Sequence, residues 1–207
     1  MAPMISVIVP IKDEPPGAAA SFERFASMPG AELIVVDARE GTRGACLARA
    51  ACEARGSVFF FVHADSTPPE NALDLIREEV TRGAAAGAFS LAYEDADPPM
   101  RWIAWWANLR SRLLRLPYGD QGIFCRRDAY EAAGGFRPLP ICDDLDLVRR
   151  LRGAGRFVIR PEVTVTSARR YRARGPLRQV LRVWKVVGGY FLGVSPERLE
   201  RWYYGSR

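Results

Sequence analysis

Three apolar runs in the first half of the chain look like buried strands, and a helical pattern follows each one. The runs are residues 5–10, 33–36 and 57–62, and the helical segments are residues 22–28, 45–55 and 67–82. Unbroken apolar runs that alternate with helices predict an α/β fold around a mostly parallel central sheet. Ligands of such sheets bind beyond the carboxyl ends of the strands. The third helix is expected to begin at Thr67 as its capping residue, with Pro68 in the first helical position.

The second half has a more mixed pattern. It predicts strands over residues 88–93, 123–126, 157–159 and 163–166, and helices over residues 101–116, 143–152, 178–191 and 196–204. No linker or repeat interrupts the chain, so we expect one domain over residues 1–207. The helix at 101–116 is amphipathic, with Trp102, Trp106 and Leu113 on one face. We expect that face to pack on the core, and contact with a membrane surface is the alternative.

The composition is that of a globular protein. Of 207 residues, 48% are hydrophobic and 11% aromatic, which excludes disordered and repetitive classes. No apolar run reaches the roughly 18–20 residues that span a bilayer, and the first residues lack the basic start of a secretory signal. We therefore expect a cytoplasmic protein. The four cysteines form no CxxC motif and are expected to be free thiols, and a single histidine, His63, argues against zinc hydrolases and Ser-His triads.

Charge is distributed unevenly along the chain. Residues 1–98 contain eight basic and 15 acidic side chains, whereas residues 99–207 contain 22 basic and nine acidic ones. Only Lys12 and Lys185 are lysines. Because arginine binds phosphate and carboxylate through two parallel hydrogen bonds, the basic half favours an anionic partner. A GC-rich genome explains the same arginines. No nucleic-acid-binding module is recognisable, so a nucleic-acid partner is not expected.

Acidic residues mark the predicted ligand edge of the sheet. Asp65 follows the third apolar run, where a carboxylate suits a hard divalent cation such as Mg²⁺ or Mn²⁺; a helix cap is the alternative. His63, just before it, suits either contact with a ribose or packing at the strand end. Asp143 and Asp144 open a helix, where acids are favoured by the helix dipole, yet adjacent carboxylates also suit one of them to general-base chemistry. Residues 119–122, Gly-Asp-Gln-Gly, form either a plain turn or a group that hydrogen-bonds a sugar.

Taken in order, these segments resemble the family 2 glycosyltransferases of the GT-A fold over nearly the whole chain. Residues 5–14 look like that family's first strand and nucleotide-side loop, and residues 33–37 like the strand whose end reads the base. Residues 60–65 stand where the family carries its DxD motif. Asp143-Asp144 stands where it carries Glu-Asp, whose aspartate is the catalytic base.

A narrower resemblance is to small bacterial members described as glycosyltransferases associated with radical SAM or selenium-related domains. The similar segments, in addition to His63-Ala-Asp-Ser-Thr-Pro68, are residues 107–113, 117–122, 147–151, 166–170 and 192–198. The chain departs from the family pattern at His63, which replaces the first DxD aspartate. Only about twenty residues separate Asp37 from the next strand, so one helix–strand unit beside the nucleotide base is expected to be missing.

The resemblance implies an inverting hexosyltransferase that moves a sugar from a UDP- or GDP-sugar to an acceptor hydroxyl with the help of Mn²⁺ or Mg²⁺. Residues 1–98 would form the nucleotide- and metal-binding half, and residues 99–207 the basic, acceptor-binding half. The implied metal ligand is Asp65, and the implied catalytic pair is Asp144 with Asp143. The implied nucleotide-binding residues are Pro10, Lys12, Glu14, Asp37, Arg43 and His63, and the implied donor- and acceptor-binding residues are Gly119, Asp120, Gln121, Arg169 and Arg170.

Other readings stay open beside this one. A non-catalytic binding protein with the same shell is the first alternative, and a nucleotidyltransferase is the second. The acceptor is not specified by the sequence. A lipid-linked acceptor is one option because of Trp102, Trp105 and Trp106, and it would bring the protein to the inner membrane surface.

Overall fold

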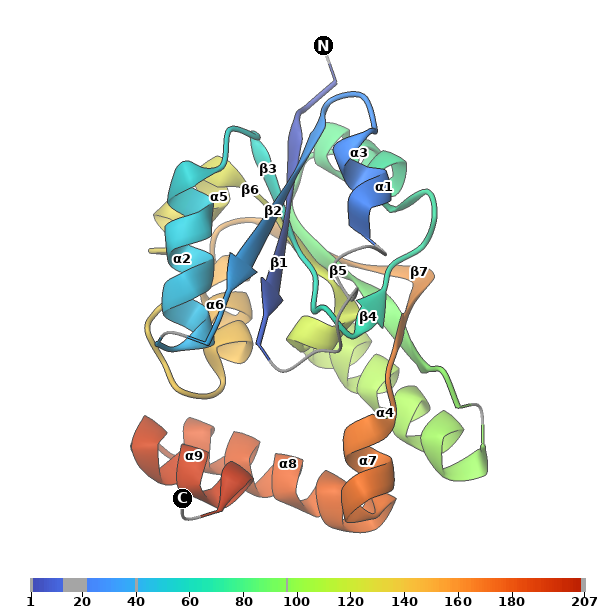
Figure 1. Ribbon diagram of the computed structural model, residues 1–207, viewed down its shortest axis with the longest axis vertical. Coiled ribbons are helices and arrows are strands. Elements are labelled where there is room, and N and C mark those ends of the chain that lie inside the picture. Colours follow the sequence, from blue (N-terminus) through green and yellow to red (C-terminus); the bar gives the residue numbers. More distant parts are fainter. Residues whose placement is uncertain (1, 13–21, 40, 96, 206–207) are drawn as a thin grey trace.

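A seven-stranded sheet forms the centre of the protein in the computed structural model, which describes residues 2–12, 22–39, 41–95 and 97–205 (Figure 1). The strand order is β2-β1-β3-β6-β5-β7-β4, and only β6 and β4 run against the direction of the other strands. The sheet is therefore mixed but mostly parallel, which confirms the predicted α/β class. The strands are β1 (Ile5–Ile11), β2 (Ala31–Asp37), β3 (Val58–Phe61), β4 (Ser66–Thr67), β5 (Ala84–Tyr93), β6 (Ile123–Arg126) and β7 (Arg156–Thr166).

Helices cover both faces of the sheet, and a further group lies across the end toward which β1 and β2 point (Figure 1). Helices α2, α5 and α6 lie on one side, α1 and α3 on the other, and α4, α7, α8 and α9 at that end. No described helix is long and apolar enough to cross a membrane. The helices are α1 (Glu23–Ala26), α2 (Arg43–Glu53), α3 (Ala72–Thr81), α4 (Pro98–Leu114), α5 (Arg127–Ala132), α6 (Asp143–Leu151), α7 (Arg169–Arg174), α8 (Pro176–Phe191), α9 (Pro196–Tyr204) and the 3-10 helix η2 (Gly119–Gln121).

Alternation along the central strands divides the core into two layers. In β3, Phe59 and Phe61 pack with α2, α5 and α6, whereas Phe60 packs on the opposite face with α1 and α3. Successive strand residues point to opposite faces of a sheet. A strand that is covered on both faces therefore needs apolar side chains at every position, which is why the run in residues 57–62 is unbroken.

Strand β2 is the edge of the sheet and is less covered than its apolar sequence predicts. Val35 is 43% exposed, and Asp37 at the end of the strand is exposed as well. Only α2 lies between β2 and β3 in the described chain, so no further strand covers this edge. The expected shortening after Asp37 is thus visible as an open strand edge.

Two predictions about local structure are wrong. Thr67 does not cap α3; Ser66 and Thr67 pair with β7 as the short strand β4, and α3 begins only at Ala72. Backbone pairing with β7 prevails over the local capping pattern, because a strand partner satisfies the backbone N–H and C=O groups of these residues.

The tryptophan face of α4 is not the core face either. Its buried face consists of Met100, Ile103, Ala104, Ala107 and Ser111, whereas Trp102 is 50% exposed.

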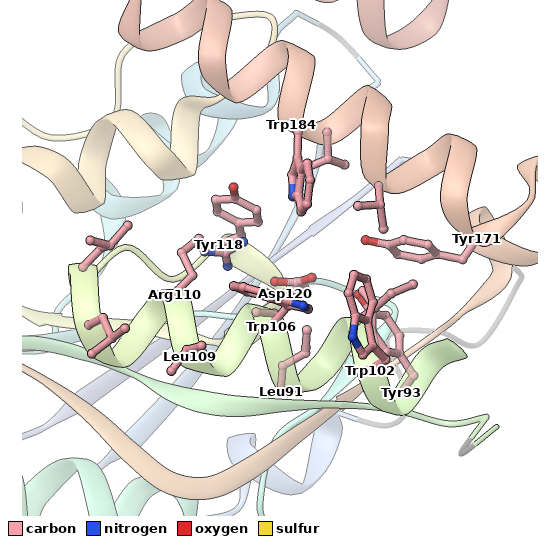
Figure 2. Close-up of a pocket in the computed structure, with 16 residues that line it drawn as sticks. Leu91, Tyr93, Trp102, Trp106, Leu109, Arg110, Tyr118, Asp120, Tyr171 and Trp184 are labelled. Carbon is pink, nitrogen blue, oxygen red and sulfur yellow. The ribbon is translucent and has the colours of Figure 1, made fainter. Parts of the chain in front are cut away.

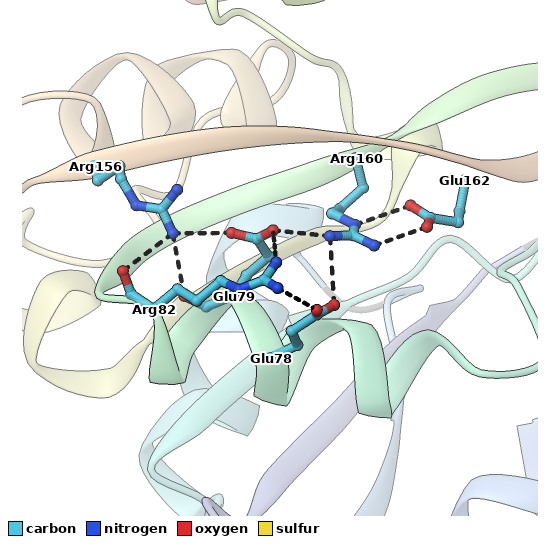
Figure 3. Close-up of polar contacts among 6 residues, drawn as sticks. All are labelled: Glu78, Glu79, Arg82, Arg156, Arg160 and Glu162. Carbon is cyan, nitrogen blue, oxygen red and sulfur yellow. Dashed lines mark hydrogen bonds and ion pairs between the residues drawn. The ribbon is translucent and has the colours of Figure 1, made fainter.

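Ion pairs between the acidic first half and the basic second half of the chain neutralise part of the charge asymmetry. The buried Glu79 of α3 forms ion pairs with Arg156 at 2.9 Å and with Arg160 at 2.8 Å, and both arginines belong to β7 (Figure 3). Burial raises the pKa of Glu79, but hydrogen bonds from these two arginines lower it by more, so the net shift of the pKa is downward. These arginines bind carboxylates of the protein itself and thus have a structural role.

Candidate active site

The candidate site lies at the edge of the sheet where β1 and β3 end. The residues that meet there come from five segments: the end of β1, the start of α2, the loop after β3, η2 and the start of α6. A small pocket is lined by Pro10, Arg43, His63, Gly119, Asp143 and Asp144, among others. Six residues to which the family resemblance gives roles in nucleotide binding, sugar binding or catalysis therefore line one pocket. We refer to Arg43, His63, Gly119, Asp143 and Asp144 as the Arg43 cluster.

Arg43 is the centre of this cluster. Thr42 caps α2 by accepting a hydrogen bond from Ala45, which fixes the first turn on which Arg43 lies. The guanidinium donates to both carboxylate oxygens of Asp143, at 2.9 and 2.6 Å, and lies 3.5 Å from Asp144. Because the Asp143 side chain is only 3% exposed, this two-bond pair is largely removed from water. Burial lowers the pKa of Arg43, but the two carboxylates raise it by more, so the cation is permanent.

His63 is neutral in this environment. Arg43 Nη1 lies 2.9 Å from His63 Nε2. Arginine has only donors, so Nε2 must accept and the ring proton must be on Nδ1. Burial and the charge of Arg43 lower the pKa of His63 to about 3, in agreement with this tautomer. His63 therefore offers a neutral N–H donor, and no positive charge, at neutral pH.

Asp144 is held as a carboxylate by backbone donors. Gly119 N donates to Oδ2 at 2.7 Å and Leu145 N donates to Oδ1 at 2.7 Å. Burial raises the pKa of Asp144, yet Arg43 and these backbone donors outweigh burial and lower it overall. Gly119 fits between Asp144 and His63 only because it lacks a side chain: a Cβ there would lie 2.3 Å from His63 Nε2.

A left-handed residue directs the two aspartates of α6 toward Arg43. Cys142 is the N-cap of α6 and has φ of 61°, a conformation that non-glycine residues rarely adopt. The chain turns sharply at this point, and Asp143 and Asp144 follow it in the first helical turn. The two acids thus lie at a helix N-terminus, where the helix dipole favours them, and both also contact Arg43; general-base chemistry by one of them stays a prediction.

Asp65, in the loop after β3, and Arg170, in the first turn of α7, lie near the cluster. The loop after β3 is anchored to the end of β7, since Ser167 N donates to the Asp65 carbonyl at 3.1 Å. The half-buried Asp65 carboxylate accepts no hydrogen bond from the residues that the structure describes. Burial lowers the pKa of Arg170, whereas Tyr203 and Asp65 raise it to give a net upward shift. Within the described parts of the chain, Asp65 thus offers a carboxylate without a hydrogen bond, close to a basic side chain.

Asp120 and Gln121 are neighbours in η2 with different surroundings. Gln121 is fully buried, and its amide bonds Ser111 and the Phe89 carbonyl at 2.7 and 2.9 Å. It therefore ties η2 to α4 and β5, and its side chain contacts protein only. Asp120 Oδ1 is buried and has no hydrogen-bond partner among the residues that the structure describes. Burial, with the charges of Asp144 and Asp65, raises the pKa of Asp120 to about 6 even though Arg110 opposes the shift.

A larger groove, which the sequence did not predict, opens beside Asp120 between α4 and α8 (Figure 2). Its volume is about 360 Å³, and we call it the α4–α8 groove. Its polar end contains Arg110, whose guanidinium lies 3.5 Å from the centre of the Tyr118 ring, next to Asp120. The sequence signal for this groove is the tryptophan stripe of residues 101–116, which the periodicity predicts to face the core.

The remaining predicted positions lie outside the Arg43 cluster. Asp37 forms an exposed ion pair with Arg39, and this pair, with backbone donation from Arg39, lowers the pKa of Asp37 to about 2. Lys12 follows β1 and is exposed, and Arg169 is exposed at the start of α7. Glu14 lies outside the described residues.

The fold is shared with solved glycosyltransferase structures. A mannosyltransferase from Pyrobaculum calidifontis, solved with GDP-Man and Mn²⁺, superposes with a TM-score of 0.65 at 16% identity over 90% of this chain and 61% of its own. S. aureus TarS 1-349, solved with UDP-GlcNAc, gives a TM-score of 0.56 at 12% identity over 79% of this chain and 58% of its own. The chain thus spans about three fifths of each neighbour. No protein-family model and no curated protein matches its sequence. The likeness establishes the fold of this chain.

Proposed function

We propose that the protein is a glycosyltransferase that transfers a sugar from a nucleotide-diphosphate donor to an acceptor hydroxyl. One observation carries this proposal: the Arg43 cluster gathers, at the strand-end edge of the sheet, residues that the family resemblance assigned to donor binding and catalysis. The shared fold with glycosyltransferases solved with GDP-Man and UDP-GlcNAc supports it. In α/β sheets this edge is where ligands bind.

In the proposed reaction Asp144 is the base. It takes the proton from the acceptor hydroxyl as the acceptor oxygen bonds to the anomeric carbon. The bond from that carbon to the diphosphate breaks on the opposite face, the nucleoside diphosphate leaves with the electron pair, and the configuration inverts. The lowered pKa of Asp144, caused by Arg43 and two backbone donors against the effect of burial, keeps it ionised and ready to accept a proton.

The donor would lie along the same edge. Pro10, Lys12, Glu14 and Asp37 are proposed to flank the nucleoside, and Arg43 and Arg170 to approach the diphosphate. The Nδ1–H of His63 is proposed to donate a hydrogen bond to an oxygen of the sugar nucleotide. Gly119 and Asp120 are proposed to face the sugar or acceptor, while Gln121 holds their loop in position, and Arg169 extends the basic rim.

The metal proposal fits the chain only together with a donor. No three His, Cys, Asp or Glu side chains of the described residues converge as a metal site. Mg²⁺ and Mn²⁺ are nevertheless held in many enzymes by one or two carboxylates plus substrate phosphates. Asp65, a carboxylate without a hydrogen bond from the described chain, would hold the ion. When bound, the ion neutralises charge that develops on the leaving diphosphate.

Thermal unfolding with UDP or GDP, each with and without Mn²⁺, tests the donor site. A ligand at 100 times its Kd adds about 2.7 kcal/mol, or roughly 5–10 °C for a domain of this size. We expect such a shift with one nucleotide and Mn²⁺ together, no shift with Mn²⁺ alone, and no metal-dependent shift in Asp65→Ala. A cooperative transition that neither nucleotide moves would contradict the proposal and favour a binding protein with another ligand.

The base assignment has a separate test. Asp144→Asn is expected to lower sugar transfer at least 100-fold and to keep the nucleotide-dependent shift, because the amide cannot accept the proton. Asp146→Asn is the control on the same helix, since Asp146 bonds Arg150 and Tyr190 outside the cluster. If transfer survives in Asp144→Asn and is lost in Asp120→Asn, the base is Asp120.

A further inference from the structure

The α4–α8 groove is lined by large aromatic side chains that remain exposed in the folded protein. Trp102 and Trp106 of α4 face Trp184 of α8 across the groove, with Tyr171 at one end (Figure 2). The three indoles are 50%, 42% and 55% exposed. Large aromatic side chains gain stability when they are removed from water. Three of the five tryptophans of the chain are thus held open around one cavity rather than packed in the core.

The shape of the groove favours a narrow ligand. Its volume of about 360 Å³ lies at the lower end of the range of small-molecule pockets, roughly 300–1,000 Å³. Two helices wall it from opposite sides, so a flat bilayer surface cannot fill it, whereas a single hydrocarbon chain can. Exposed apolar patches of this kind mark ligand grooves or contact surfaces, and the walls here favour the ligand.

The polar end of the groove gives the ligand an orientation. Asp120 Oδ1 is buried and has no hydrogen-bond partner in the described part of the chain, and Arg110 is stacked on Tyr118 beside it. A buried polar atom without a partner is costly, and a ligand hydroxyl would satisfy it. One residue away, Gly119 N bonds the Asp144 carboxylate. A head group at Asp120 therefore lies next to the proposed base.

We propose that the α4–α8 groove binds the apolar chain of an amphiphilic acceptor, a long-chain alcohol whose hydroxyl lies beside Asp120. The assignment of this alcohol as the acceptor rests on the proposed function. The chain lies between the tryptophans of α4 and α8, and the hydroxyl points from Asp120 toward the Arg43 cluster. The acceptor class is then set by apolar contact, and a free sugar or other fully polar acceptor would leave the groove empty.

Quenching of tryptophan fluorescence by 11-bromoundecan-1-ol, below its solubility limit, tests the binding directly and needs no donor. Bromine quenches indoles that it contacts, and three tryptophans line the groove. We expect saturable quenching at one equivalent, and no saturable quenching by 2-bromoethanol, which has the same head group without the chain.

A pair of variants on α8 tests the location. Val183→Arg puts a charge into the groove, whereas Leu181→Arg puts the same charge on the same helix at a 53% exposed position outside the lining. We expect at least a tenfold weaker affinity in the first and an unchanged affinity in the second. Equal effects of both variants, or quenching that never saturates, would overturn the proposal.

Two parallel measurements separate this inference from the proposed function. If the alcohol binds and nucleotides shift the melting temperature, both stand. A nucleotide shift without saturable alcohol binding overturns the acceptor inference alone, and alcohol binding without a nucleotide response overturns the transferase. Binding to phosphatidylglycerol vesicles without binding of the monomeric alcohol would assign α4 and α8 to a membrane surface instead, and would also overturn the inference.

Discussion

The Arg43 cluster and the α4–α8 groove lie side by side, yet they satisfy their own groups to very different degrees. In the cluster the guanidinium, the imidazole and both carboxylates are bonded to one another or to backbone N–H groups. In the groove three indoles are exposed, and the buried Oδ1 of Asp120 has no hydrogen-bond partner among the described residues. The cluster is held rigid before any ligand arrives, whereas the groove gains its missing contacts only from a ligand. Changes to the cluster should therefore cost stability, and changes to the groove should cost binding.

The largest loss of stability is expected from Asp143→Ala. It leaves Arg43 without its two-bond partner in a site that is mostly buried, and breaking such a pair costs roughly 3 kcal/mol. Chemical denaturation measures the loss. The matched control is Asp37→Ala, which removes an Arg–Asp pair that is open to solvent and should leave the unfolding midpoint nearly unchanged. Equal effects of the two changes would show that burial does not strengthen the Arg43 cluster.

A methyl group at Gly119 should disturb the cluster without removing any charge. The new Cβ would lie 2.3 Å from His63 Nε2, so His63 or the η2 loop must move, at a cost of roughly 1–3 kcal/mol. We expect Gly119→Ala to lose the nucleotide-dependent melting shift as well. Gly188→Ala in α8 is the control with the opposite sign. Apart from its chain neighbours and the backbone of its own helix, no atom of the described residues lies within 4 Å of its new Cβ, and alanine favours the helix by up to about 1 kcal/mol.

At the boundary of the two regions, Asp120→Asn should stabilise the protein in a pH-dependent way. Burial and neighbouring carboxylates raise the pKa of Asp120 to about 6, above about 3.9 for an unfolded chain. The native state then binds the proton more tightly, so the wild type loses stability as pH rises from about 4 to 6. The asparagine variant avoids that loss. We expect it to exceed the wild type by roughly 1–3 kcal/mol at pH 7.5 and to match it near pH 3.5, as measured by denaturation at each pH.

The sequence predicts the parts of the fold that burial alone determines. Strands β1 and β3 are covered on both faces, and their unbroken apolar runs identify them directly. The acidic residues at the sheet edge were found for a similar reason, because a charge at the end of a buried strand requires an explanation. What joins Arg43 to Asp143 is a contact over 100 positions of sequence, and no local pattern predicts that pairing.

The sequence analysis fails where a partner that is distant in sequence decides the local structure. Thr67 has a good local capping pattern, but β7 is available as a strand partner 98 positions later, and Val165 pairs with it. In α4 both stripes are apolar enough to face the core. The small-residue stripe with Ala107 does so, because β5 lies close to the helix, which Asn108 anchors through two hydrogen bonds to Leu91. Periodicity finds an apolar stripe but does not say which of two stripes is buried.

The smallest effect on stability is expected where the effect on binding is large. Trp184→Ala removes an indole that is 55% exposed, so the free energy of unfolding should fall by less than about 1 kcal/mol. The affinity for the bromoalcohol, measured by saturable quenching of the two remaining groove tryptophans, should weaken at least fivefold. Trp202→Ala is the counterpart: Trp202 is partly buried and packs against the core beside Gly189, with Lys185 Nζ 4.6 Å from the centre of its ring, so its loss should lower stability by more and leave alcohol binding intact. If Trp184→Ala destabilises the protein as much as Trp202→Ala, the groove is a packed part of the core. The opposite pattern in the two variants is what a surface kept open for a ligand requires.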